Sequence, residues 1–144
     1  MVAERITFLN RDTTSFVDEM KQKVADFFQT RGISQNANFA MVLKTVVIMT
    51  VTFGAYGLIL SNMFSPWIML ILAVVMGMGL AGIGFSISHD ALHGAYSSNP
   101  TINRILGFTF DFLGANGYIW KLTHNVIHHT YTNIPGIDED LDVS

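Results

Sequence analysis

The stretch from Thr45 to Ser88 contains no Asp, Glu, Lys, Arg or His. One helical crossing of a lipid bilayer needs roughly 20 apolar residues, so this stretch is too long for one membrane helix and about right for two. Turn-forming polar residues and a proline interrupt it at Ser61–Pro66, where one helix can end and another can begin. The sequence therefore predicts two membrane-spanning helices, at about 39–60 and 66–88.

Composition and charge agree with an integral membrane protein. Hydrophobic residues make up 50% of the chain, charged residues only 13%, and the mean hydropathy is +0.39. Arg31 precedes the first span, and Lys44 lies within its first turns, from where its long side chain can extend to the lipid headgroups. Arg104 and Lys121 follow the second span, and the loop between the spans has no basic residue. By the positive-inside rule we expect two spans with both termini in the cytoplasm.

Composition also excludes several classes of protein and site. The first thirty residues are rich in charge and contain no apolar core of a signal peptide. A net charge of −3 predicts no nucleic-acid partner. The chain has no cysteine, which excludes disulfides, iron–sulfur ligation and thiolate metal sites. Histidine, carboxylate and amide groups remain as metal ligands.

All five histidines fall into two clusters, His89-Asp-Ala-Leu-His93 and His124-Asn-Val-Ile-His128-His129. Histidines four residues apart on a helix share one face, so each cluster can offer two nitrogens to one metal ion. Neighbours on a helix point about 100° apart, so we expect His129 to be aimed away from an ion shared by His124 and His128. Two metal ions are then favoured over one. A structural role stays open, most of all for His129.

Further helices are predicted outside the apolar stretch. A helix is expected from Ser15, which resembles the start of a capping box, to Gly32, with an apolar stripe that fits either a membrane surface or ordinary packing. Residues 1–12 are expected to be extended or loose. A short helix from Asn99-Pro100 to about Gly114 is too short to span and is placed in the interface or as a re-entrant segment. A bend over 114–120 should precede a helix at 121–130, closed by Pro135-Gly136.

Three further features each have two interpretations. Small residues in the second span fit close helix packing or room for a lipid chain: Gly77, Gly79, Ala81, Gly82, Gly84 and Ser88. Asp90 could orient a neighbouring histidine through a hydrogen bond, as carboxylates behind metal ligands do, or be surface charge. An acidic run is a solvated tail or lies against the metal: Asp138, Glu139, Asp140 and Asp142.

These observations predict an all-α membrane protein, in which a transmembrane helical hairpin is joined to cytoplasmic or interfacial helices that carry the histidine clusters. Three regions are expected. Residues 1–38 form an N-terminal cytoplasmic segment with an amphipathic helix, residues 39–88 form the hairpin, and residues 89–144 form the cytoplasmic region of the histidine clusters and the interfacial helix.

The segments HDALHG and HNVIHHTYTN, with Pro-Gly and Asp-Glu-Asp after the second, resemble the histidine boxes of the membrane fatty-acid desaturases. The likeness is to acyl-CoA or acyl-lipid desaturases of the front-end or linoleoyl-type branch and covers about residues 39–142. It implies an enzyme that uses O2 and two electrons to introduce a C=C bond into an acyl chain. It also implies two iron ions, held by His89, His93, His124, His128 and His129, and a separate electron donor of the cytochrome b5 or ferredoxin type.

The chain departs from the family in having no third histidine box and no second pair of spans. We therefore expect it to correspond to the N-terminal portion of a desaturase and to be inactive alone. A related di-iron hydroxylase and a non-enzymatic metal- or haem-binding membrane protein remain as alternatives. A metalloprotease is disfavoured because HDALH lacks the glutamate that acts as general base in His-Glu-x-x-His.

Overall fold

The computed structural model describes residues 14–138, which form helices joined by short turns and loops, with no strand among them. Contacts divide the chain into two compact units, Met1–Gln35 and Asn36–Ser144. The segment expected to be loose, 1–12, lies outside the described residues. So do Glu139, Asp140 and Asp142 of the acidic run.

Within residues 14–35, the described part of the first unit, there is one helix, α1 (Thr14–Arg31), which ends at Gly32 with a φ of 60°. The helix begins one residue before the predicted cap, so Ser15 lies inside its first turn. The side chain of Lys23 forms an exposed ion pair with Glu19, at 2.7 Å between Nζ and Oε1. The predicted apolar stripe is present and largely exposed: Phe16, Met20, Val24 and Phe27.

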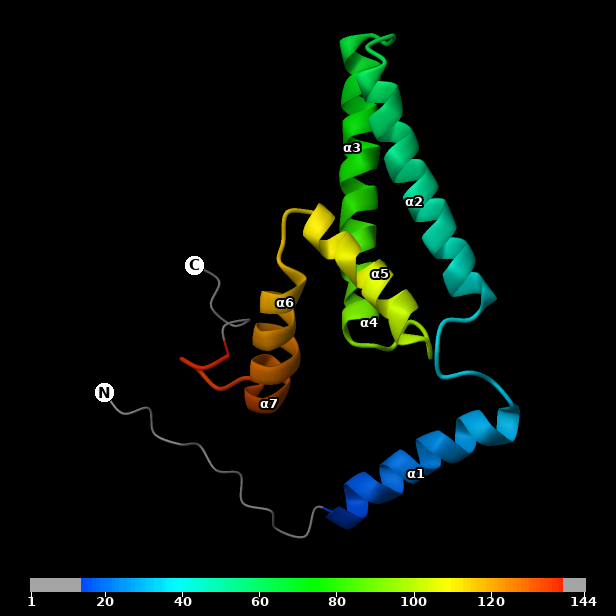
Figure 1. The fold of residues 1–144 in the computed structure, drawn as a ribbon, viewed down its shortest axis with the longest axis vertical. Coiled ribbons are helices and arrows are strands. Elements are labelled where there is room, and N and C mark those ends of the chain that lie inside the picture. The colour runs from blue at the N-terminus through cyan, green and yellow to red at the C-terminus, as the bar shows by residue number, and fades with distance from the viewer. Residues whose placement is uncertain (1–13, 139–144) are drawn as a thin grey trace. The chain divides into compact units, whose positions relative to one another are not determined.

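The second unit begins with two long helices that lie side by side (Figure 1). Helix α2 (Phe39–Leu60) starts where the side chain of Asn38 accepts a hydrogen bond from the Met41 N–H at 3.0 Å. Helix α3 (Pro66–Gly82) has its proline in the first turn and continues through a π-helical segment, η1 (Ile83–Ser88), into α4 (His89–Leu92). Both helices are long and apolar enough to cross a membrane, with mean hydropathies of 1.8 and 2.4.

Small and hydroxyl-bearing side chains contribute to the contact between α2 and α3. Thr45, Thr52 and Ala55 are the buried residues of α2, and the two threonine hydroxyls donate to backbone carbonyls one turn earlier. Gly79 of α3 lies directly against Thr52: a Cβ placed there would collide with the threonine hydroxyl. Close packing is therefore confirmed at Gly79, whereas a Cβ at Gly77 would meet open space.

The outward surfaces of α2 and α3 are apolar and exposed, as at Val46, Phe53, Leu70 and Val74. This arrangement is the reverse of a water-soluble pair of helices, which would turn these side chains toward each other. Helices with an apolar exterior and a small polar seam suit an apolar solvent.

The start of α2 is tied to the chain that follows α4. The Tyr96 hydroxyl lies 2.8 Å from Thr45 Oγ1, and both residues are buried. The Ala37 N–H donates to the Tyr96 carbonyl at 3.0 Å. Lys44, which we expected to extend toward lipid headgroups, instead donates through Nζ to Ser86 Oγ at 2.6 Å. These bonds hold the N-terminal end of α2 against η1 and the segment that follows α4.

The short predicted helix is confirmed as α5 (Pro100–Phe112), capped by Asn99, whose side chain accepts from the Thr101 N–H at 2.9 Å. It packs on η1 and α4. The hydroxyls of Ser88 and Thr109 are 2.7 Å apart, and Gly107 lies against Leu92. Helix α5 therefore packs against α4, the helix that carries the first histidine cluster.

The predicted bend over 114–120 is wrong in its second half. Gly114 has a φ of 84° and turns the chain, but a helix already begins at Gly117 because the Asn116 side chain accepts from the N–H groups of Tyr118 and Ile119, both at 3.0 Å. This helix runs through α6 (Gly117–Trp120), a π-helical segment η2 (Lys121–His128) and α7 (His129–Tyr131).

Candidate metal centre

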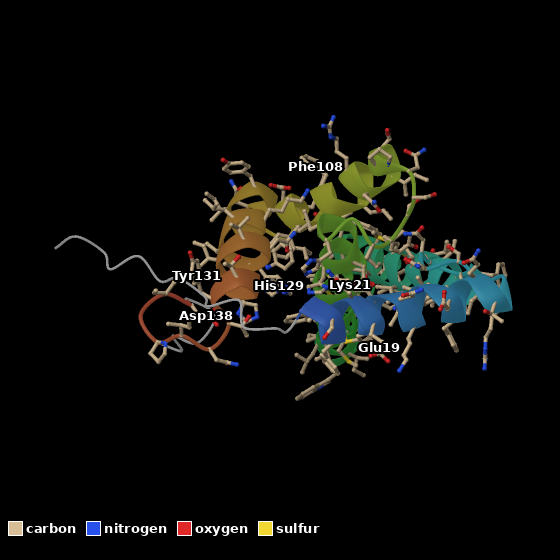
Figure 2. All side chains as sticks on the ribbon, turned by 90° about the horizontal axis from the view of Figure 1, so that it is seen from below. Glu19, Lys21, Phe108, His129, Tyr131 and Asp138 are labelled. Atoms are coloured by element: carbon tan, nitrogen blue, oxygen red, sulfur yellow. The ribbon has the colours of Figure 1, made fainter. Side chains whose placement is uncertain are left out.

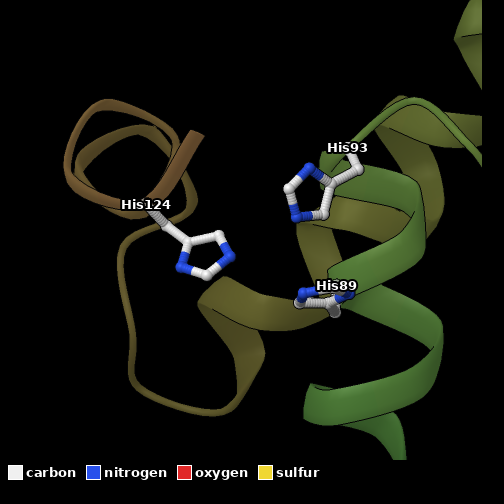
Figure 3. A group of neighbouring side chains, drawn as sticks. All are labelled: His89, His93 and His124. Carbon is white, nitrogen blue, oxygen red and sulfur yellow. The ribbon is translucent and has the colours of Figure 1, made fainter. Parts of the chain in front are cut away.

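Three histidines from two separate helices come together. His89 and His93 lie at the start and the end of α4, and His124 lies in η2 across from them (Figure 3). One ring nitrogen from each of the three lies within 4.8 Å of the others. The two sequence clusters, which are more than thirty residues apart, thus converge on one point.

The donor set fits a transition metal. Three ring nitrogens bound to one ion at about 2.1 Å lie about 3.4 Å apart in a tetrahedral site, so the separations here, which reach 4.8 Å, would have to shorten by up to about 1.4 Å for all three to bind together. Imidazole suits iron, copper, zinc and nickel, so the three rings do not choose among these ions by themselves.

His128 and His129 also lie at this centre. The His128 ring stacks on the His124 ring, with centroids 5.0 Å apart and an interplanar angle of 14°. The His129 ring lies 5.0 Å from that of His124 and 5.1 Å from that of His93. Figure 2 shows His129 between its own helix and the helix of the first cluster.

The spacing in an α-helix led us to expect that His129 is turned away from the other rings, and this prediction is wrong. The reason is the π-helical geometry of η2, which places more residues in each turn than the 3.6 of an α-helix. Residues both four and five positions after His124 then come to its side of the helix. The adjacent residues His128 and His129 can therefore both lie beside the other rings of the centre.

The environment of the centre favours neutral imidazole at His93. Burial, together with the charges of the neighbouring His89, His124 and His129, holds the pKa of His93 below its ordinary value. The carboxylate of Asp90 acts in the opposite direction but is the weakest of these influences. A neutral ring keeps a nitrogen lone pair available, which is the form that binds a metal.

Trp120 borders the centre and was not singled out by the sequence. Its indole stacks on the His124 ring at 4.4 Å and meets the rings of His89 and His93 edge-on, each at 5.4 Å. The signal was available in the sequence, since Trp120 precedes His124 by four residues and such pairs share a helix face. This pairing was missed because Trp120 was predicted to lie in a bend and not in a helix.

Two carboxylates lie beside histidines of the centre. Asp90 Oδ1 is 3.2 Å from His89 Nδ1, and both side chains are partly exposed. Asp138 is completely buried, and its two oxygens lie 2.9 and 3.1 Å from His128 Nδ1. From the sequence, Asp138 was predicted only as one member of an acidic run, and nothing in its spacing distinguishes it from its neighbours.

Asn125 links the two helices of the centre. Its Nδ2 donates to the backbone carbonyl of Leu92 at 3.2 Å. That carbonyl belongs to the last turn of α4, where carbonyls have no partner within the helix. The bond therefore joins the residue before His93 to the residue after His124 and sets the spacing of the two clusters.

Comparison with known proteins gives a consistent result. The family model described as fatty acid desaturase matches residues 65–143. The chain is 41% identical over 98% of its length to an sn-1 linoleoyl-lipid 6-desaturase of Synechocystis sp. and 37% identical over 88% to one of Arthrospira platensis. It is 30% identical over 96% of its length to an acyl-lipid (8-3)-desaturase of Physcomitrium patens.

The chain spans 39%, 34% and 29% of the lengths of these three relatives, respectively. No solved structure matches it significantly.

Proposed function

Because the chain belongs to the fatty acid desaturase family, we propose that the protein introduces a C=C bond into a fatty-acyl chain, using O2 and two electrons at a centre of two iron ions bound by histidine. The observation that carries this proposal is the convergence of His89, His93 and His124, with one ring nitrogen of each within 4.8 Å of the others. When bound, iron would supply the oxidation of an unactivated C–H bond that no side chain can perform.

The residues of this chain would hold and surround the metal. We assign His89, His93, His124, His128 and His129 as ligands, since their rings form one connected group. Trp120 would cover one side of that group and keep water from it. Asn125 would keep the two ligand-bearing helices at a fixed separation.

The hairpin would bring the metal centre to the cytoplasmic surface of the membrane. We propose that α2 and the continuous helix from Pro66 to Leu92 cross the bilayer as a hairpin, with both termini of the chain in the cytoplasm. The first cluster then leaves the lipid at the end of the second span. The three regions 1–38, 39–88 and 89–144 would be a cytoplasmic segment, the hairpin and the metal-binding region.

The substrate we propose is an acyl group attached to a membrane lipid rather than acyl-CoA, because the relatives described above are named as acyl-lipid or linoleoyl-lipid desaturases. Two electrons must come from outside, since O2 accepts four and the acyl chain provides two. We propose a separate donor of the cytochrome b5 or ferredoxin type. Membrane lipid would surround the hairpin.

The proposal is tested by His89→Ala, His93→Ala and His124→Ala in the full-length protein, expressed in a host that supplies lipid and donor. We expect each variant to lose unsaturated product, measured by gas chromatography of fatty-acid methyl esters, and to lose bound iron, measured by elemental analysis. Gln22→Ala, on the exposed surface of α1, is the control and should retain both.

Three outcomes would contradict the proposal. A hydroxylated product in place of an alkene would indicate the related hydroxylases. A Soret absorption band would indicate haem. Full iron content in all three histidine variants would show that these residues are not ligands.

A further inference from the structure

We propose that Asp138 is a positioning residue of the metal centre, which holds the His128 ring so that its Nε2 faces the metal. This inference rests on the proposed function, because it assumes that His128 is a ligand. It concerns a residue that follows His128 by ten positions and lies beyond the end of the helix that carries the second cluster.

The contact between the two side chains fixes the proton on His128. Both oxygens of Asp138 lie within hydrogen-bonding distance of His128 Nδ1, at 2.9 and 3.1 Å. An ionised carboxylate can only accept, so Nδ1 must carry a proton and donate it. In a neutral ring the other nitrogen, Nε2, is then left with a lone pair, which is the state that binds a metal ion.

The backbone before Asp138 turns so that the Asp138 carboxylate lies beside His128. After α7 the chain turns back at Asn133, with a φ of 63°, and at Gly136, with a φ of 78°. The N–H of Asp138 donates to the Ile134 carbonyl at 3.1 Å, which closes the turn. Figure 2 shows Asp138 beside the end of the helix that carries His129 and Tyr131.

The Asp138 carboxylate also accepts a hydrogen bond from the backbone. The N–H of Asn133 donates to Asp138 Oδ2 at 2.8 Å. A carboxylate with no exposure to water is costly unless it is hydrogen-bonded and lies near positive charge. Asp138 has donors from the backbone and from an imidazole, and the metal ion would add positive charge on the far side of that ring. This environment differs from that of a solvated acidic tail.

The test uses Asp138→Asn, which changes one oxygen to a nitrogen at constant shape, in the full-length protein. We expect iron affinity, measured by competition with a chelator, to fall by about 10- to 100-fold, the usual effect of removing a partner behind a metal-bound histidine. The Mössbauer spectrum of the remaining bound iron should change. Asp26→Asn makes the same chemical change on the exposed surface of α1 and should alter neither.

A double variant separates positioning from general support of the fold. If Asp138 acts through His128, Asp138→Asn should add less than about twofold to the loss of iron affinity already caused by His128→Ala, because coupled residues are not additive. Full additivity would overturn the proposal. If His128→Ala alone leaves iron affinity and the spectrum unchanged, His128 is not a ligand and the inference about Asp138 is overturned, whereas the proposed function is tested separately by the variants of His89, His93 and His124.

A measurement on the unaltered sequence covers the case in which Asp138→Asn does not fold. In metal-free protein labelled with 15N-histidine, the signals that disappear in His128→Asn report the ring of His128. We expect them to show a proton on Nδ1 and none on Nε2. A proton on Nε2 instead would overturn the proposal.

Discussion

Asp90 and Asp138 each lie beside a histidine of the centre, but water reaches only one of them. The side chains of His89 and Asp90 are 38% and 32% exposed and share one contact of 3.2 Å. Partly exposed pairs of this kind contribute about 0–1 kcal/mol, because solvent screens the charges. Asp138, by contrast, is completely buried and accepts from both an imidazole and a backbone N–H.

Asp90→Asn should therefore lower iron affinity by about fivefold or less, which is the equivalent of at most about 1 kcal/mol. The measurement is the same chelator competition as for Asp138→Asn, performed on the two variants in parallel. A loss for Asp90→Asn as large as that for Asp138→Asn would show that exposure does not decide the importance of these carboxylates.

At the level of single residues, the sequence predicted the histidines better than their surroundings. All five were selected because they cluster in the sequence, but α-helical spacing gives a shared face only for the pairs His89–His93 and His124–His128, and it predicted the wrong direction for His129. Asp138 could not be selected from its acidic neighbours, because its position depends on the turn at Asn133 and Gly136. Trp120 has a helical spacing to His124 but lay in a segment predicted as a bend.

Gly79 is the glycine of α3 that lies closest to α2. Gly79→Ala should destabilise the pair of helices by about 1–3 kcal/mol, the usual cost of overfilling a packed contact, because the new methyl group would overlap the hydroxyl of Thr52. We expect a lower midpoint of thermal unfolding in detergent and a lower yield of folded protein.

Gly77→Ala is the matched control for that prediction, since it makes the same change two residues earlier where nothing lies within 4 Å. It should leave the unfolding midpoint unchanged or raise it slightly, because alanine favours a helix more than glycine does. Thr52→Ala should partly rescue Gly79→Ala by removing the hydroxyl, while the Cβ of residue 52 stays close. Equal effects of the two glycine variants would show that the seam is not tightly packed.

The ends of the long helices were predictable because local chemistry sets them. Proline opens α3, Asn99 caps α5, and the turn-forming residues at 61–65 end α2. The π-helical segments were not predictable: both η1 and η2 have the composition of ordinary helix. In η2 the additional residue in a turn brings His129 to the same side of the helix as His124.

On the scale of the second unit, length and polarity place the histidines at one end of the helix pair. At 1.5 Å per residue, the 22 residues of α2 extend about 33 Å, close to the thickness of the apolar part of a bilayer. In the proposed hairpin, the turn at 61–65 would lie at one surface of the membrane. Residues 94–99, which follow the first cluster and bond to the start of α2, would lie at the other.

This arrangement predicts the sides of the membrane from which introduced thiols can be reached. The chain contains no cysteine, so Met63→Cys, Ser98→Cys and Gln22→Cys each place a single thiol within it at an exposed position. In vesicles of known orientation, we expect a membrane-impermeant maleimide to label residues 22 and 98 from the cytoplasmic side and residue 63 only from the opposite side. Each variant should retain desaturated product, because none of the three residues lies at the metal centre. Labelling of residues 63 and 98 from the same side would mean that the helix pair lies along the bilayer or enters it without crossing, and the metal centre would then need another route to the acyl chain.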